Sequence, residues 1–252
     1  MPVLGTCKLC LNDAPLLKSH YMPAAVYPTK RQKSATIMRN ELYSGHTAHI
    51  KEHLLCKDCE DKFNHNGESE VLKWVAPRAR KFSLSDRLKV ALARETYPDI
   101  ARYAAYEIGV DAAKFGYFAL SVVWRGAIHQ WLFHDGTRST LLNLEPHQET
   151  IRRFLNGDTS AFPREITSVI VLVCSDTEAR SLWTLPSQDK ESGCDHIRFV
   201  LRGIFFRVLL EPTIPRMFRD SSCVSPRQCI WYGSSAHRMK QDFASLLKAP
   251  VK

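Results

Sequence analysis

The sequence predicts an α+β fold that begins with a small cysteine-rich unit and continues into a helical segment and a small mixed or antiparallel sheet. Three observations predict it. Two Cys-x2-Cys pairs lie within residues 7–59. The stretch 111–133 is apolar on nearly every helical face, as in a helix buried on all sides. The run 166–174, ITSVIVLVC, is rich in β-branched residues, which is typical of a buried strand.

The first part of the chain is predicted to hold little regular structure before the second cysteine pair. Residues 1–23 and the polar, basic stretch 24–50 favour loops or a short ribbon. A strand near 49–55 is expected to lead into a helix that reaches about residue 75. The dipeptide Asn66-Gly67 is expected to interrupt this helix, because asparagine and glycine favour turns.

A boundary is predicted at Pro77 and the basic run 78–81, where the helical pattern stops. We therefore divide the chain into a first domain, residues 1–76, and a second domain of unknown role, residues 77–252.

The second domain is predicted to begin with helices and to end in strands. Arg125 lies in the most apolar helix and needs a buried partner, for which the sequence suggests Glu107 or Asp111. Arg202-Gly203 indicates a hairpin turn. The expected helices are near 86–92, 99–107, 111–133, 145–155 and 235–248, and the expected strands are 166–174, 182–185, 196–201 and 204–210.

The two Cys-x2-Cys pairs predict one structural zinc site, because four thiolates in a tetrahedron suit Zn²⁺. The pairs are separated by 45 residues, Leu11 to Leu55, which is longer than in a compact zinc finger. This spacing favours a treble clef, in which an N-terminal knuckle meets a second pair at the start of a helix. The remaining cysteines lack this spacing. The expected ligands are Cys7, Cys10, Cys56 and Cys59.

The chain is basic, with a net charge of +9, which favours either an anionic partner or simply a well-solvated surface. Residues 1–102 hold 17 Lys and Arg against 11 Asp and Glu, a balance of +6. Nucleic acid is the partner that such a patch most often binds. The candidate phosphate contacts are Lys30, Arg31, Lys33, Arg39, Arg78, Arg80 and Lys81.

A cytoplasmic location without a membrane segment is expected. Residues 1–6 do not form the charged start and apolar run of a signal peptide. The longest apolar candidate, 115–132, is interrupted by Arg125, His129 and Gln130. In a reducing cytoplasm, paired cysteines are expected to bind metal rather than to form disulfides.

Four motifs then follow one another in a recognisable order. They are Cys-x2-Cys, Ser-His-x-x-Pro, Leu-Leu-Cys-x2-Cys-Glu and Phe-Asn…Gly-Glu, at 7–10, 19–23, 54–60 and 63–68. This order resembles bacterial members of the HNH endonuclease superfamily with a zinc-bound treble clef, the ββα-metal fold. The resemblance covers roughly residues 5–75, and the stretch 121–125 resembles the same set more faintly.

The resemblance implies a metal-dependent DNA endonuclease, in a bacterial phage-defence or mobile-element system. In such enzymes a histidine at the end of a strand activates water, and a divalent ion such as Mg²⁺ or Mn²⁺ stabilises charge on the phosphate. By motif position, His20 is the implied base. The implied helix residues of the catalytic site are Glu60, Asn64 and Glu68.

Three positions depart from the family pattern. Ser19 stands where an aspartate usually precedes the histidine, and a hydroxyl is a poor ligand for a hard cation. Lys51, flanked by His49 and His53, stands where the family has an asparagine, and Glu60 stands where it has the helix histidine.

These departures leave two other hypotheses open. The chain is then a non-catalytic zinc module that binds nucleic acid or a partner protein. Alternatively, the function lies in residues 84–252 as a domain that senses a ligand or a protein partner. For the endonuclease, residues 77–252 are expected to recognise a target or a protein partner.

Overall fold

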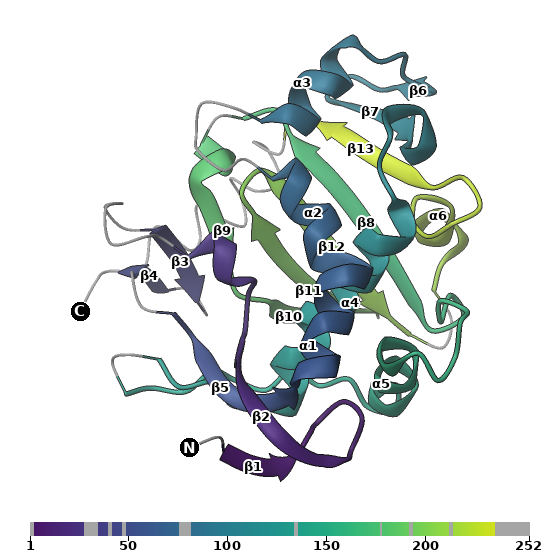
Figure 1. The fold of residues 1–252 in the computed structure, drawn as a ribbon. Helices are drawn as coiled ribbons and strands as arrows, with labels where there is room; N and C mark the ends of the chain where they lie inside the picture. The colour runs from purple at the N-terminus through teal and green to yellow at the C-terminus, as the bar shows by residue number, and fades with distance from the viewer. Residues whose placement is uncertain are drawn as a thin grey trace.

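The computed structural model describes residues 3–27, 35–39, 42–46, 49–75, 82–133, 136–176, 178–191, 194–211 and 214–234. Within these residues the chain forms one three-stranded and one ten-stranded sheet, with helices packed between and around them (Figure 1). The prediction of a mixed helix-and-sheet protein is thereby confirmed.

The three-stranded sheet carries the N-terminal cysteine pair. Its strands are β1 (Val3–Thr6), β2 (Asp13–His20) and β5 (Lys51–Cys56), in the order β1-β2-β5, and all pairs are antiparallel. The sequence predicted β5 but not β1 or β2, since β1 is short and β2 lacks an apolar run. Strand β2 instead alternates exposed and half-buried residues over most of its length.

The ten-stranded sheet follows the order β4-β3-β9-β11-β12-β8-β13-β7-β6, with β10 beside β11. It is mixed, because β13 runs parallel to β8 and β3 runs parallel to β9. Its strands are β3 (Ala35–Arg39), β4 (Leu42–His46), β6 (Glu95–Thr96), β7 (Ile100–Ala104), β8 (Thr167–Cys174), β9 (Leu182–Thr184), β10 (Ser187–Glu191), β11 (Cys194–Leu201), β12 (Ile204–Leu210) and β13 (Cys229–Gly233).

The helices are short, apart from one. The α-helices are α1 (Lys57–Phe63), α2 (Ser69–Trp74), α3 (Ser83–Val90), α4 (Ala112–Ile128), α5 (Gln148–Asn156) and α6 (Arg216–Asp220). Single turns of 3₁₀ helix are η1 (Ala24–Val26), η3 (Ala105–Ile108) and η4 (Glu178–Ser181).

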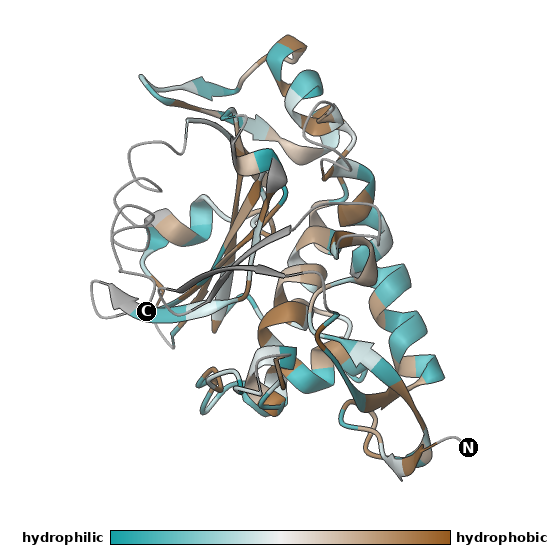
Figure 2. Cartoon of the chain, turned by 90° about the vertical axis from the view of Figure 1, so that its left-hand side faces the viewer, coloured by the Kyte–Doolittle hydropathy of each residue, from teal (hydrophilic) through white to brown (hydrophobic). Residues whose placement is uncertain are grey.

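Helix α4 is the buried centre of the fold, as the apolar stretch predicted. It begins after Asp111, whose side chain accepts a hydrogen bond from the Lys114 amide. Phe115 and Phe118 pack against Phe206 of β12, which presses the helix onto the large sheet. Viewed edge-on, the helices lie beside this sheet, and hydrophobic residues are concentrated in its strands (Figure 2).

One continuous helix joins α1 to α2 through a π-helical segment, η2 (Asn64–Glu68). The expected interruption at Asn66-Gly67 is therefore a change of helix type and not a break. Gly67 is required here, because a Cβ would lie 2.9 Å from the backbone nitrogen of Phe118. This segment and α4 thus approach each other at backbone distance. Single π turns of this kind occur frequently at functional sites.

The prediction of a helix over 99–107 is wrong. Residues 100–104 form β7, whose partner β13 the sequence did not reveal. Alanine and tyrosine suit either state, so pairing with β13 decides the conformation. The Arg202-Gly203 turn is confirmed, with both residues at positive φ. The predicted boundary run 78–81 and the predicted helix 235–248 lie outside the described residues.

The two predicted domains share structure within the described residues. Strands β3 and β4, from the first segment, extend the large sheet of the second. One cluster of buried apolar side chains also runs from Cys7 to Ile230. The division at residue 76 stays a prediction.

Candidate functional site

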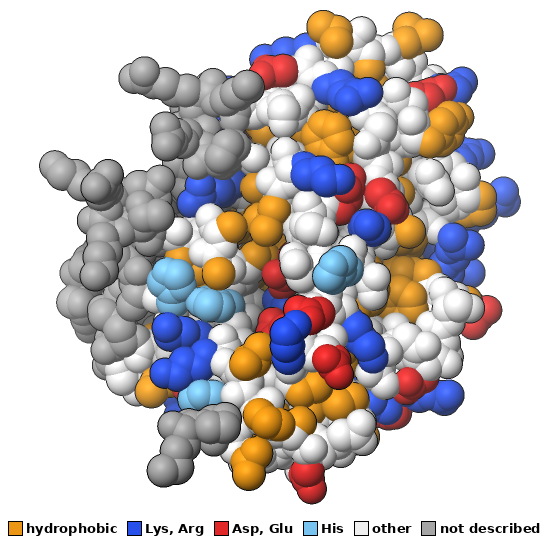
Figure 3. All heavy atoms as spheres, viewed as in Figure 1, with side chains coloured by type: hydrophobic (Ala, Val, Ile, Leu, Met, Phe, Trp, Pro, Cys, Tyr) orange, Lys and Arg blue, Asp and Glu red, His pale blue; other side chains and the backbone are white. Residues whose placement is uncertain are grey.

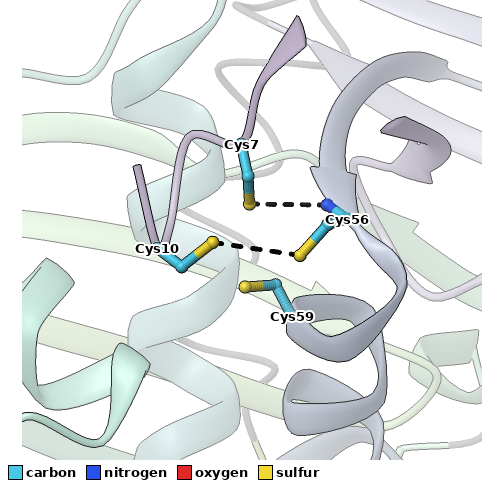
Figure 4. Close-up of side chains that lie close together, drawn as sticks. All are labelled: Cys7, Cys10, Cys56 and Cys59. Carbon is cyan, nitrogen blue, oxygen red and sulfur yellow. Dashed lines mark hydrogen bonds between the residues drawn. The ribbon is translucent and has the colours of Figure 1, made fainter. Parts of the chain in front are cut away.

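The two cysteine pairs meet in one group (Figure 4). Their four sulfur atoms all lie within 4.8 Å of one another, and Cys10 Sγ is 3.9 Å from Cys56 Sγ. A tetrahedron with metal–sulfur bonds of ~2.3 Å has neighbouring sulfurs about 3.8 Å apart. The four cysteines, Cys7, Cys10, Cys56 and Cys59, therefore form a group that can hold a metal ion.

Local backbone geometry explains why the sulfurs converge. The first pair lies on a turn that ends at Leu11, a residue with positive φ, whose amide donates to the Cys7 carbonyl. The second pair spans the junction of β5 and α1, where the Cys56 amide donates to Cys7 Sγ at 3.4 Å. A hydrogen bond from the Cys59 thiol lowers the pKa of Cys7 to about 4, which favours the thiolate that a metal needs.

Helix α5 holds the first cysteine pair from outside. The Arg152 guanidinium donates to the Leu9 carbonyl, between the two cysteines of the pair, and also to Glu149. The pKa of Arg152 is raised, chiefly by its hydrogen bond to Glu149, and the charge of Cys10 adds to the effect. Arg152 therefore places a positive charge beside a group that becomes strongly negative when four thiolates bind one divalent ion.

We predict that Arg152→Met weakens metal binding by about 10-fold, a typical cost of losing a group that supports metal ligands. The measurement is competition for Zn²⁺ against a chromophoric chelator. Arg153→Met is the matched control, because Arg153 is the exposed neighbour on the same helix. Equal Zn²⁺ affinities for the two variants would show that Arg152 does not support the metal.

His20 is the last residue of β2 and lies in a cluster of aromatic side chains. Its Nε2 is 2.9 Å from Nδ1 of His49, and the two rings meet edge to face. Tyr27 stacks on His49 with ring centroids 4.7 Å apart and contacts Trp183 of β9. His20 therefore lies where the small sheet meets the large one. Histidine, basic and acidic side chains gather on the face seen in Figure 3.

The His20 imidazole is neutral at pH 7. Burial is the largest of the causes that together lower the pKa of His20 to about 4; the neighbouring His49, Lys51 and Arg125 act in the same direction, and Glu68 opposes the shift. Protonation would place a cation in a half-buried site that already faces other positive charges. A neutral imidazole can accept a proton from water, which is what a general base requires.

Ser19 does not face the same side of the strand as His20. Its hydroxyl is buried and accepts a hydrogen bond from the Leu55 amide at 3.2 Å. The register between β2 and β5 shifts between Leu17 and Lys18, so the ladder is irregular here, and Ser19 satisfies the Leu55 donor. Serine at this position is explained by the strand pairing.

Glu68, at the end of the π-helical segment, is a helix carboxylate whose charge acts to raise the pKa of His20. Its Oε1 lies 2.5 Å from the Arg125 guanidinium. The sequence had suggested Glu107 or Asp111 as the partner of Arg125; Glu107 instead pairs with Arg94, and Asp111 caps α4.

Glu60 and Asn64 lie less close than Glu68 to the level of His20 along the helix. His20 lies four residues beyond Leu16, the partner of Cys56, or roughly 13 Å along β2. Measured along the helix axis from Lys57, Glu60 is only roughly 5 Å away, whereas Glu68 is roughly 16 Å away. Asn64 is exposed. In the part of the chain that the structure describes, no hydrogen bond or ion pair joins His20 to either residue.

Most of the predicted phosphate contacts lie outside the described residues. Arg39 is the last residue of β3, and the other six lie outside the described residues: Lys30, Arg31, Lys33, Arg78, Arg80 and Lys81.

Sequence reasoning missed the roles of His49 and Arg125. His49 was visible only as a histidine beside the position of the missing asparagine. The sequence holds one indication of the role of Arg125: it is a charged residue in an apolar helix, and a buried charge requires a partner. Which partner it has depends on the approach of α4 to η2, and no local pattern encodes that approach.

Comparison of the chain with protein-family models, with curated proteins and with solved structures found no match. Among the described residues, none of the helices has the length and apolar composition needed to cross a membrane.

Proposed function

We propose that this chain is a metal-dependent DNA endonuclease of the HNH type, with His20 as general base. One observation carries the proposal: a neutral, half-buried histidine at a strand end, hydrogen-bonded to His49, in a site where the negative charge of Glu68 acts on it. In the tautomer whose Nε2–H donates to His49, the lone pair on Nδ1 of His20 accepts the proton of the attacking water. His49 then fixes the orientation of the ring.

The four-cysteine group is proposed to bind Zn²⁺ as the structural ion of a treble clef. An all-thiolate tetrahedral donor set suits zinc. The order of the elements also supports the proposal, because a knuckle, the antiparallel β2–β5 pair (the hairpin) and a helix that starts at the second pair occur in this order, with β3 and β4 inserted between the two strands. The ion would fix the turn between β1 and β2 against the junction of β5 and α1, and so hold the helix that carries Glu68.

A divalent catalytic ion would have few protein ligands at His20. Within the described residues, the four cysteines are the one group of three or more metal-ligating side chains. A carboxylate with substrate phosphate and water is nevertheless a usual set for Mg²⁺. Glu68 offers that carboxylate, and its contact with Arg125 uses one oxygen. When bound, such an ion stabilises negative charge on the phosphate and the leaving oxygen.

The test is a plasmid assay with purified protein and Mg²⁺, Mn²⁺ or Ni²⁺. Supercoiled DNA should become nicked or linear, and a chelator should stop the reaction. Intact plasmid with all three ions would refute the endonuclease. A role in phage defence or in mobile elements is implied by the resemblance alone and stays a prediction.

A non-catalytic module that binds nucleic acid is the second candidate. It is favoured because Ser19, which stands where the family has an aspartate, uses its hydroxyl to bind the Leu55 amide. On the hairpin, His20 lies opposite Lys51, and Lys18 lies opposite His53. Opposite residues in paired strands project on one face, so this face is basic beside His20. Lys18 and Lys51 are exposed. Both candidates therefore share one phosphate-binding surface.

We predict that Lys18→Ala and Lys51→Ala each weaken DNA binding and reduce the slope of log affinity against log salt by about 1. The measurement is fluorescence anisotropy of labelled duplex DNA over a range of salt concentrations, with a chelator present to prevent cleavage. Lys57→Ala is the control, because Lys57 is exposed on α1 and pairs with Asp61. Unchanged slopes for Lys18 and Lys51 would exclude this face as the DNA contact.

A further inference from the structure

Arg125 is a buried charge in the most apolar helix of the fold. Its side chain is 2% exposed. A guanidinium removed from water is destabilising unless it is paired and hydrogen-bonded, so its position needs an explanation in its contacts. Those contacts are made with the end of β2, which carries His20, and with the π-helical segment, which carries Glu68.

On one side lies the strand end that carries His20. Arg125 Nη1 donates to the carbonyl of Tyr21, the residue that follows His20, at 3.4 Å. On the other side lies the π-helical segment, where Nη2 donates to Oε1 of Glu68 at 2.5 Å. The guanidinium also lies over the ring of Phe63, 4.6 Å from its centroid. One side chain therefore joins three elements at the level of His20.

The helix contacts explain how Arg125 reaches this position. Gly67 allows η2 to touch the backbone of α4 at Phe118. Arg125 is seven residues after Phe118, which is two helical turns, so both project from the same face of α4. The residue adjacent to Gly67 is Glu68, and the π turn shifts its direction relative to an ordinary α-helix.

We infer that Arg125 is a positioning residue, which sets the distance and orientation of Glu68 relative to His20 by binding Glu68 and the Tyr21 carbonyl together. The inference rests on the proposed function for its catalytic meaning. Two contacts made at once need the planar, forked guanidinium; a lysine ammonium is a single point charge on a flexible chain and cannot reproduce them.

The experiment compares Arg125→Lys and Glu68→Gln, alone and together, with Arg94→Lys as the matched control. Arg94 pairs with Glu107 away from His20 and is half exposed. We expect Arg125→Lys to lower kcat by about 100-fold with little change in KM, because misplacing a group in a site costs rate more than binding. The double variant should be no slower than the slower single variant, as for residues that act as a unit. The control should cleave like the unchanged protein.

The second readout does not depend on cleavage. The ¹⁵N chemical shifts of the His20 ring report its tautomer and its hydrogen bond to His49. They should change in Arg125→Lys and in Glu68→Gln, and stay unchanged in Arg94→Lys. If the unchanged protein cuts no DNA, the proposed function fails, and these shifts still decide whether Arg125 positions Glu68 against His20. If Arg125→Lys does not fold, Glu68→Gln alone decides.

Two results would overturn the inference. One is a kinetic result: either Arg125→Lys has a normal kcat, or the losses of kcat in the two single variants multiply in the double variant. The other is a His20 ring spectrum that Arg125→Lys and Glu68→Gln leave unchanged.

Discussion

Replacing His20 with alanine should reduce DNA cleavage by about 10²- to 10⁴-fold, the usual contribution of a general base. The reason is chemical, because the variant loses the one neutral imidazole at the end of β2 that can accept the proton of the attacking water. The assay is initial-rate cleavage of supercoiled plasmid with each of the three divalent ions.

The matched control for this prediction is His65→Ala. His65 is exposed, lies in the same π-helical segment as Glu68, and bonds the Asp61 carbonyl instead of His20. It should cleave normally. Equal rates for His20→Ala and the unchanged protein, with every ion, would remove His20 from the mechanism. DNA binding that persists in His20→Ala while neither protein cuts would support the non-catalytic module.

The pH dependence follows from the same site. Burial and neighbouring positive charges lower the pKa of His20 to about 4, against an ordinary value of 6.5. Cleavage should therefore persist as the pH falls below 6.5 and decline only toward pH 4. The stability of the fold, like the cleavage rate, should decrease as the pH falls. The unfolded chain binds the proton first, so His20 makes the fold less stable as pH falls from 6.5 to 4, and has no effect above 6.5.

Replacing Cys59 with serine should release the metal and unfold the N-terminal hairpin. Cys59 is buried and is one of the four converging sulfurs. Structural zinc supplies about 10–16 kcal/mol of binding free energy in zinc-finger peptides, so losing a ligand should cost several kcal/mol of local stability. The measurements are metal content by mass spectrometry, with one Zn²⁺ expected per unchanged chain, and hydrogen exchange over residues 3–27 and 49–63.

The control here is Cys174→Ala, a buried cysteine on β8 outside the four-cysteine group. It should retain the metal and the hairpin protection. The large sheet should stay protected in both variants, because α4 packs on β12 through phenylalanine side chains that do not involve the metal. A Cys59→Ser protein that keeps full metal content and full hairpin protection would contradict the assignment.

The metal group and the buried helix could be predicted from the sequence because their causes are local. Two Cys-x2-Cys turns each direct two sulfurs to one side, so they identify a metal group before any fold is known. The stretch that became α4 is apolar on nearly all faces, which requires burial in any arrangement. The turn at Arg202-Gly203 and the strand β8 have equally local causes.

The proposed catalytic carboxylate could not be chosen in this way. Glu60, Asn64 and Glu68 recur at four-residue spacing on one helix, so motif position cannot distinguish them. The choice depends on how far the helix runs back along the β2–β5 hairpin, and Glu68 lies nearest the level of His20. The strand β7 was misassigned for a similar reason, since its partner β13 is more than 100 residues away in the sequence.

The sequence by itself determined that four cysteines form a group able to hold a metal ion, that an apolar helix lies at the centre and that His20 lies between the two cysteine pairs. Only the tertiary structure decided what surrounds His20. Strand pairing turned Ser19 toward Leu55, the loop before β5 brought His49 onto the ring, and the close approach of α4 to Gly67 brought Arg125 to Glu68. The physical reason is that these contacts join residues distant in sequence, and their geometry is fixed by packing and not by any local pattern.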